Sequence, residues 1–321
     1  MPLMLNEAIF MGQAPKGYTS LSGQSGAWAT DNADAPIIRV LGERHTGTRA
    51  MIGMIEALPH LSASYTTPAA RGARHVLNLM KAAADVEARS QGGSEVQSAF
   101  RDAKSLARPR AACWKHAYMQ WDDSFFALAG VIISQRNPYS WVLAMFSRPY
   151  HHVGARIKDL DTFISTPWLT IPRERMALAV ASPVALWVEK LAAAQRFAKQ
   201  AEIPVTFLAF EPFLADPVAR LGAALSELGQ SAEGLVALAQ STKTEEPLEK
   251  VQARHAAEPW RKWLTSAQVA AINAHLDPEV AEAAGYALEN PANFPDVLAD
   301  ADARTLQDYL THRQANKPHR A

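Results

Sequence analysis

Short apolar runs alternate along the chain with longer segments in which apolar residues recur at helical spacing. The short runs predict buried strands at residues 37–41, 131–134 and 204–209, and a further apolar run covers residues 111–116. Helices are predicted at residues 48–58, 139–146, 183–202, 217–229 and 265–276, the last with Thr265 as its N-cap. Because strands alternate with helices, the pattern predicts βαβ units and therefore an α/β fold with a parallel sheet.

The chain divides by composition into three parts. Residues 1–35 are rich in Gly, Ser, Ala and Asp and are predicted to form a loose N-terminal lead-in, residues 36–302 carry the alternating elements of one α/β domain, and residues 303–321 are predicted to be a polar, frayed C-terminal tail. Within the domain, residues 66–108 are predicted to form one or two helices and a mobile loop over the site.

Composition narrows the class of protein. The 321 residues are 48% hydrophobic, which is ample for a sizeable core, and 32 Lys and Arg balance 32 Asp and Glu, so the overall charge favours neither nucleic acid nor an anionic membrane as a partner. Cys113 is the single cysteine, which excludes a disulfide framework and a Cys-based metal site. The sequence shows no apolar run of about 20 residues and no signal-peptide pattern, so we expect a cytoplasmic protein without a membrane span.

The loop after the first predicted strand has the layout of an anion cradle. Its sequence, Gly-Glu-Arg-His-Thr-Gly-Thr at 42–48, joins a strand to a helix, so its N–H groups and the positive end of that helix would face an anion. Amide and hydroxyl donors would come from Thr46, Gly47 and Thr48. Arg44 or His45 would add a cation. The loop lacks the G-x-x-x-x-G-K-[ST] pattern, which argues against ATP held with magnesium, and an ordinary turn with a threonine N-cap is the alternative.

Two other motifs carry candidate chemistry. Arg136 follows the strand at 131–134, and ligands of parallel sheets bind outside the carboxyl ends of strands, where an arginine can bind phosphate through two N–H groups. His116 closes the apolar run at 111–116, and a neutral imidazole there could act as a general base. A solvated arginine and a structural histidine are the alternatives.

In order and spacing these motifs resemble the sulfotransferases that use 3′-phosphoadenosine-5′-phosphosulfate (PAPS). In that family a Ser-Gly-Thr-Thr loop after the first strand cradles the 5′-phosphosulfate. Residues 46–48 resemble that loop, with Arg49 in the final threonine position. His45 stands where the family has a lysine, with Arg44 beside it.

The later motifs resemble the same family. The family's Arg-Asn-Pro arginine, which binds the 3′-phosphate, corresponds to Arg136. Ala144 stands where the family has a serine, so Ser140 or Ser147 would make the contact of that serine. The Lys-Thr-His segment of cytosolic members, whose histidine is the general base, is similar to Trp-Lys-His with His116 retained.

Two C-terminal segments extend the resemblance to about residues 36–290. Residues 210–217 resemble the family's Tyr-Glu-Asp-Leu…Asp-Pro segment and residues 260–268 its Trp-Lys…Thr…Gln segment, while Arg254 falls where the lysine of its Arg-Lys-Gly would be. The resemblance implies a three-layer α/β/α domain, similar to nucleotide kinases, around a parallel sheet of about five strands.

The implied activity is transfer of a sulfuryl group from PAPS to a hydroxyl or amine of a small-molecule or glycan acceptor, by in-line displacement and without a metal. His116 would be the general base, and Arg44 and His45 would stabilise developing charge. The implied cofactor contacts are Arg44, His45, Thr46, Gly47, Thr48, Arg49, Arg136, Ser140 and Arg254. A nucleotide-dependent phosphotransferase and a non-catalytic nucleotide-binding protein of the same fold are alternatives, and the acceptor and oligomeric state stay open, with a homodimer among the alternatives.

Overall fold

The computed structural model describes residues 35–64, 94–150, 156–242 and 246–315. The chain divides into two units, Met1–Asp31 and Asn32–Ala321, and the described residues all belong to the second. The predicted lead-in up to residue 34 and the greater part of the predicted loop region, residues 65–93, lie outside the described residues.

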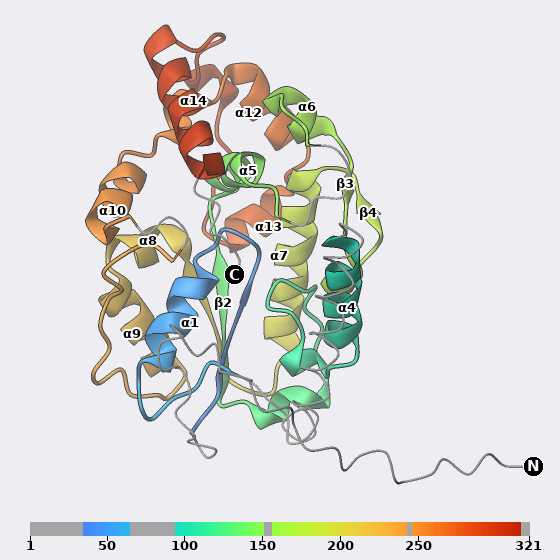
Figure 1. Ribbon diagram of the computed structural model, residues 1–321, viewed down its shortest axis with the longest axis vertical. Helices are drawn as coiled ribbons and strands as arrows, with labels where there is room; N and C mark the ends of the chain where they lie inside the picture. The colour runs from blue at the N-terminus through green and yellow to red at the C-terminus, as the bar shows by residue number, and fades with distance from the viewer. Residues whose placement is uncertain (1–34, 65–93, 151–155, 243–245, 316–321) are drawn as a thin grey trace, which may run out of the picture. The chain divides into compact units, whose positions relative to one another are not determined.

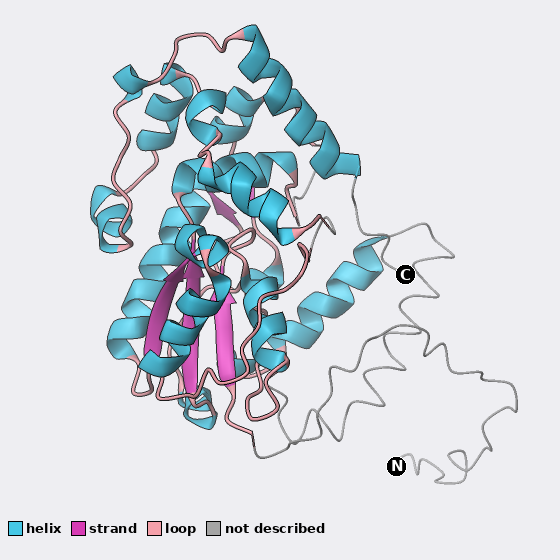
Figure 2. Ribbon diagram, turned by 90° about the vertical axis from the view of Figure 1, so that its left-hand side faces the viewer, coloured by secondary structure: helices cyan, strands magenta, loops and turns pink. Residues whose placement is uncertain are grey.

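Three parallel strands form the central sheet (Figure 2). The strands are β1 (Ile38–Gly42), β2 (Gly130–Gln135) and β5 (Val205–Ala209), in the order β1–β2–β5. Each lies within one residue of its predicted ends. β2 is buried along its whole length because it lies between two strands and two layers of helices, which is why its sequence is a continuous apolar run. The predicted α/β fold with a parallel sheet is confirmed.

The resemblance implied about five strands, but the described part of the chain has three in this sheet. The apolar run at 111–116 is not a strand, because its first residues close a single 3-10 turn, η2 (Arg110–Ala112), after Pro109. Its first two residues are alanines, which are depleted in strands, and it has no β-branched residue. Ala111 instead packs with Phe197 in a cluster that covers one face of the sheet.

Helices cover both faces of the sheet, and Figure 1 shows them on the two sides of β2. On one face, α1 (Thr48–Glu56) and α9 (Pro217–Glu227) pack against Ile132. On the other face, α7 (Pro183–Gln200) packs against Val131. Successive side chains of a strand point to opposite faces, so adjacent residues of β2 belong to different cores. The described elements therefore form three layers.

The remaining elements surround this sandwich. They are α4 (Ser94–Leu106), η3 (Asp123–Ala127), α5 (Pro138–Ser147), α6 (Leu160–Ser165), β3 (Trp168–Leu169), η4 (Pro172–Glu174), β4 (Ala179–Val180), α8 (Phe210–Ala215), α10 (Leu248–Ala256), α11 (Trp260–Trp263), α12 (Ser266–Asn273), α13 (Pro278–Ala283), η5 (Pro291–Asn293) and α14 (Asp300–Ala315). Thr265 caps α12 through a reciprocal pair of hydrogen bonds with Gln268, as predicted for this N-cap. None of the described helices has the length and apolar character that crossing a membrane requires.

The C-terminal segment departs from its prediction. The expected frayed tail from residue 303 is helical as far as Ala315, within α14. Two aspartates lie in the first turn of α14, and His312 and Arg313 lie in the last, an order that the helix dipole favours. Tyr309 packs on Trp263 with ring centroids 4.8 Å apart, which anchors α14 to the core. The boundary predicted at 302/303 therefore falls inside a helix.

Candidate functional site

The loop between β1 and α1 depends on two glycines. Gly42 has a φ of 152° and lies so close to β2 that a Cβ there would overlap the carbonyl oxygen of Ser134. Gly47 precedes α1 with a φ of 83°, and a Cβ there would lie 3.0 Å from the ring of Phe210. Thr46 Oγ1 donates a hydrogen bond to the carbonyl oxygen of Glu43 at 2.6 Å. The loop is therefore held in one conformation by close backbone approaches that larger residues would prevent.

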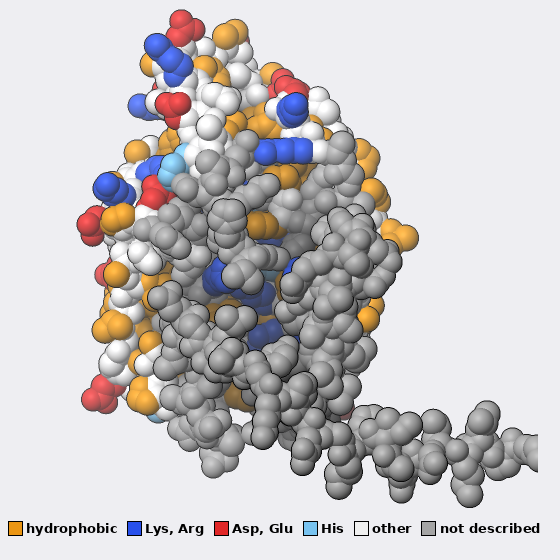
Figure 3. Space-filling model, viewed as in Figure 1, with side chains coloured by type: hydrophobic (Ala, Val, Ile, Leu, Met, Phe, Trp, Pro, Cys, Tyr) orange, Lys and Arg blue, Asp and Glu red, His pale blue; other side chains and the backbone are white. Residues whose placement is uncertain are grey.

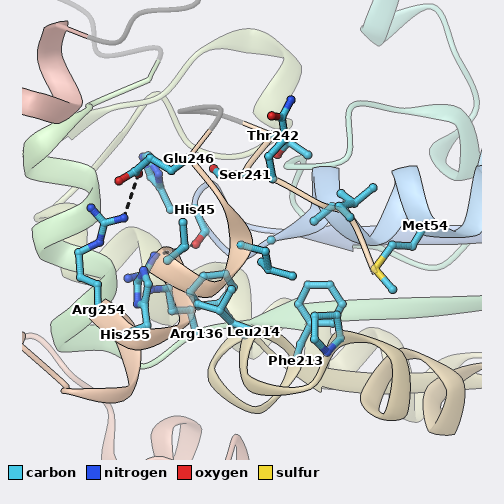
Figure 4. Close-up of a pocket in the computed structure, with 18 of the residues that line it drawn as sticks. His45, Met54, Arg136, Phe213, Leu214, Ser241, Thr242, Glu246, Arg254 and His255 are labelled. Atoms are coloured by element: carbon cyan, nitrogen blue, oxygen red, sulfur yellow. Dashed lines mark hydrogen bonds and ion pairs between the residues drawn. The ribbon is translucent and has the colours of Figure 1, made fainter. Parts of the chain in front are cut away.

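A pocket opens beside this loop and the N-terminal end of α1 (Figure 4). Its apolar part is lined by Met54, Phe213, Leu214, Pro217 and Leu238. Its basic part is lined by His45, Arg136, Arg254, His255 and Arg313. Figure 4 shows His45, Arg136, Arg254 and His255 at one end and Met54 and Phe213 at the other. The pocket thus offers an apolar surface, three arginines and two histidines to a single ligand.

Arg136 reaches this pocket from the carboxyl end of β2, as predicted. Its side chain is buried, with Nε donating to Ser140 Oγ at 2.9 Å and Nη1 donating to the carbonyl oxygen of His45 at 3.0 Å. The guanidinium lies 4.6 Å from the ring centroid of Phe210. Burial lowers the pKa of Arg136, which still stays charged at neutral pH. Ser140, a predicted cofactor contact, acts here by holding Arg136 in place.

The sequence left open whether Arg44 or His45 faces the predicted anion site, and in the structure His45 is the one that lines the pocket. Its φ of 64° turns the side chain out of the loop, where its ring stacks on Tyr150 with centroids 5.2 Å apart. Its Nε2 lies 3.0 Å from the carbonyl oxygen of Arg148, so Nε2 carries the hydrogen. His45 Nδ1 then accepts from Nη2 of Arg313 at 3.2 Å.

Arg44 points elsewhere, which corrects the expectation that it adds a cation to the cradle. Its guanidinium lies 2.7 Å from Glu43 Oε1, contacts Glu174 directly, and faces the ring of Trp114 at 5.1 Å. Lys190 completes the cluster, 2.5 Å from Glu43 Oε2. Burial alone would lower the pKa of Arg44, but the two carboxylates raise it. Arg44 is a structural cation and is not among the residues that line the pocket.

The other loop residues divide between the pocket, a second cavity and the surface. Gly47 lines the pocket, whereas Thr46 lines a smaller cavity on the other flank of the loop. Thr48 is the buried first residue of α1. The N-cap of α1 is Gly47, so no side chain caps this helix. Arg49 is exposed on α1 and lines neither space.

His116 lines the smaller cavity together with Thr46, Ser134 and Lys190. It lies in the turns after η2 and not at the end of a strand. Its Nδ1 is 2.6 Å from the carbonyl oxygen of Gly42, so Nδ1 must carry the hydrogen and Nε2 holds the lone pair of the neutral ring. Burial lowers the pKa of His116 well below its usual value, with a further contribution from Lys115. The ring is therefore neutral at pH 7.

Among the pocket residues that the sequence analysis missed are His255, Tyr309 and Arg313. The pKa of His255 lies well below its usual value, first because the ring is buried and then because Arg136, Arg313 and Arg254 lie near it. Arg313 and Tyr309 come from α14, which was predicted to be a frayed tail. The acidic first turn and basic last turn of residues 300–315 are the signal that could have indicated a helix here.

The predicted residue Arg254 does line the pocket, but Glu246 pairs with it at 2.9 Å and offsets its charge. On the face shown in Figure 3, some Lys and Arg side chains are visible near the centre, and others lie toward the margins with the visible Asp and Glu side chains. The described residues thus bring four predicted cofactor residues to one pocket: His45, Gly47, Arg136 and Arg254.

Comparisons of the chain with protein-family models and with curated proteins find no match.

Proposed function

We propose that this protein is a PAPS-dependent sulfotransferase. The observation that carries the proposal is the pocket beside the loop, which combines an apolar part with a basic part that holds Arg136 and His45. A base and ribose need the first kind of surface, and the phosphate groups of a nucleotide need the second. The N-terminal end of α1, preceded by Gly47, adds the N–H groups that favour a 5′-phosphosulfate.

Arg136 is the residue that we assign to the 3′-phosphate. Its Nε and Nη1 groups already donate to Ser140 and His45, which orients the guanidinium before a ligand arrives. Among the described residues no carboxylate lies within ion-pair distance of Arg136, although the charge of Glu211 acts on it and opposes the lowering of its pKa by burial. Loss of one charge-assisted hydrogen bond costs about 1.5–3 kcal/mol, which is roughly ten- to a hundredfold in affinity.

In the proposed reaction an acceptor hydroxyl or amine attacks the sulfur of PAPS. A bond forms between the acceptor atom and sulfur while the bond from sulfur to the bridging oxygen of the 5′-phosphate breaks, which releases 3′,5′-adenosine bisphosphate. The acceptor proton passes to Nε2 of His116, whose lone pair is left available by the Nδ1 hydrogen bond to Gly42. Thr46 lines the same cavity as His116 and belongs to the loop that borders the pocket.

One observation favours the second candidate, a non-catalytic nucleotide-binding protein. His116 lines the smaller cavity, whereas His45, Gly47 and Arg136 line the pocket, so base and cofactor residues occupy opposite flanks of the loop. The two candidates make the same prediction for nucleotide binding and differ in the prediction for transfer.

Thermal unfolding with 3′,5′-adenosine bisphosphate, PAPS, AMP and ATP with magnesium tests the proposal. We expect the first two to raise the melting temperature, and Arg136→Ala to abolish the rise while Arg304→Ala, an exposed arginine of α14, leaves it intact. Release of the bisphosphate is then measured against hydroxyl and amine acceptors. His116→Ala should abolish transfer and leave nucleotide binding unchanged. No stabilisation by either 3′-phosphorylated nucleotide would refute both candidates, and binding without transfer to any acceptor would favour the second.

A further inference from the structure

The C-terminal helix α14 brings two polar side chains to the basic end of the pocket. Tyr309 and Arg313 lie one helical turn apart, and both line the pocket. Nη1 of Arg313 donates to the hydroxyl oxygen of Tyr309 at 2.6 Å, and its guanidinium lies 5.3 Å from the centroid of that ring. Tyr309 is itself fixed by its packing on Trp263. The position of Arg313 is therefore set by the core of the protein.

Arg136 and Arg313 converge on one residue. Arg136 donates to the backbone oxygen of His45 at 3.0 Å, and Arg313 lies 3.2 Å from the Nδ1 of the same residue. In the described part of the chain neither guanidinium has a carboxylate within ion-pair distance, whereas Arg254 in the same pocket is paired with Glu246. Arg136 is buried and Arg313 is partly buried, so water screens the repulsion between their like charges only in part, and an anion between them would offset it.

Two further observations indicate that an anion is the missing partner. The Nε of Arg313 is buried and has no hydrogen-bond partner. Burial alone would raise the pKa of Tyr309, yet the positive charges of Arg313 and Arg136, helped by hydrogen bonds with Arg313 and Ser147, hold it below its usual value. A bound dianion would satisfy the donors and offset these positive charges.

We propose that Arg313 and Tyr309 of α14 bind a phosphate group of the nucleotide together with Arg136, so that the C-terminal helix is part of the cofactor site. The assignment of the phosphate to an adenosine bisphosphate rests on the proposed function. The inference that an anion binds here rests on the side chains alone. Arg136 approaches the phosphate from the sheet and Arg313 from α14, and the Tyr309 hydroxyl donates to a third oxygen. The ligand class is a nucleoside bisphosphate, with one phosphate at the loop and one between the two arginines.

Calorimetric titration of the full chain with 3′,5′-adenosine bisphosphate and with AMP tests this proposal. Arg313→Ala should weaken binding of the bisphosphate ten- to a hundredfold, and Tyr309→Phe, which keeps the packing on Trp263, should weaken it several-fold. Arg304→Ala is the matched control, because Arg304 is exposed on the same helix and bonds only a backbone oxygen. Weakening confined to the bisphosphate supports the proposal that Arg313 shares the 3′-phosphate with Arg136, and equal weakening of AMP contradicts it.

Hydrogen exchange gives a second readout that does not depend on a variant. Saturating bisphosphate should slow amide exchange in α14 of the wild-type chain.

If the wild-type chain binds the bisphosphate but Arg313→Ala binds it as tightly as Arg304→Ala does, the role of α14 is refuted and the proposed function stands. If the wild-type chain binds no adenosine nucleotide, the proposed function is refuted. In that case pyrophosphate tests the anion site. If pyrophosphate stabilises the wild-type protein and not Arg313→Ala, the anion site is supported; if it does not stabilise the wild-type protein, the anion site is refuted.

Discussion

The substitution Glu174→Gln removes one charge from the buried cluster of Glu43, Arg44, Glu174 and Lys190 and leaves the volume of the side chain unchanged. The four groups balance in charge, and Glu174 is fully buried, in contact with Arg44 and 3.4 Å from Lys190 Nζ. At 3.4 Å and an effective dielectric constant of about 20, one pair of unit charges attracts by about 5 kcal/mol. Most of this attraction offsets the cost of removing the charges from water.

The net effect of Glu174→Gln is an uncompensated buried cation. Breaking a buried pair from one side costs about 3–5 kcal/mol, and we expect a value near the lower end, about 3 kcal/mol, because Glu43 still pairs with both cations. Urea unfolding followed by tryptophan fluorescence measures the free energy of unfolding. Glu258→Gln is the matched control, since its partner Arg261 lies 2.7 Å away but both side chains are largely exposed, and we expect a loss of about 0–1 kcal/mol. Equal losses in the two variants would refute the reasoning.

Three further outcomes are expected. Gly42→Ala should lower the free energy of unfolding by about 2 kcal/mol or more, because its Cβ would overlap a backbone oxygen of β2. Gly229, at a φ of 71°, has no atom near the position of a Cβ, so Gly229→Ala should cost about 1 kcal/mol. Similar losses in the two variants would contradict the steric account. The pKa of His255 is held below its usual value by burial and nearby arginines, so the unfolded chain takes up the proton first and stability should fall below about pH 6.5, by up to roughly 1.4 kcal/mol per pH unit. His255→Asn should reduce that slope in unfolding curves between pH 5.5 and 7.5, and an unchanged slope would exclude His255 as its source. Ser140→Ala removes the acceptor of Arg136 Nε and should weaken binding of adenosine bisphosphate about tenfold with little change in melting temperature; unaltered affinity would show that Ser140 does not position Arg136.

Local sequence patterns were sufficient where a residue's place depends on its neighbours in the chain. The β-branched run ending at Ser134 predicted β2, and the turn that follows it placed Arg136 at the carboxyl end of the sheet. The Gly-bearing loop between β1 and α1 was also evident, because a strand, a tight turn and a helix each have a local signature. By contrast, the apolar run at 111–116 lacks branched residues, and its packing against Phe197 decided its structure.

The direction of each charged side chain needed the tertiary structure. Arg44 and His45 are adjacent in the sequence, and both could serve as the cation of the loop. Glu174 and Lys190, far along the chain, form the buried cluster that holds Arg44 away from the pocket. Arg148 and Arg313 contact the ring of His45 and hold it at the pocket.

The sequence by itself determined the order of the strands along the chain, the strand–turn–helix layout of the loop and the place of Arg136. The tertiary structure alone decided that His45 and not Arg44 lines the pocket, that His116 lies on the other flank of the loop, and that α14 supplies Arg313. The physical reason is that hydrophobic periodicity and turn chemistry act over a few residues. The direction of a buried charge depends on partners that only folding brings within a few ångströms.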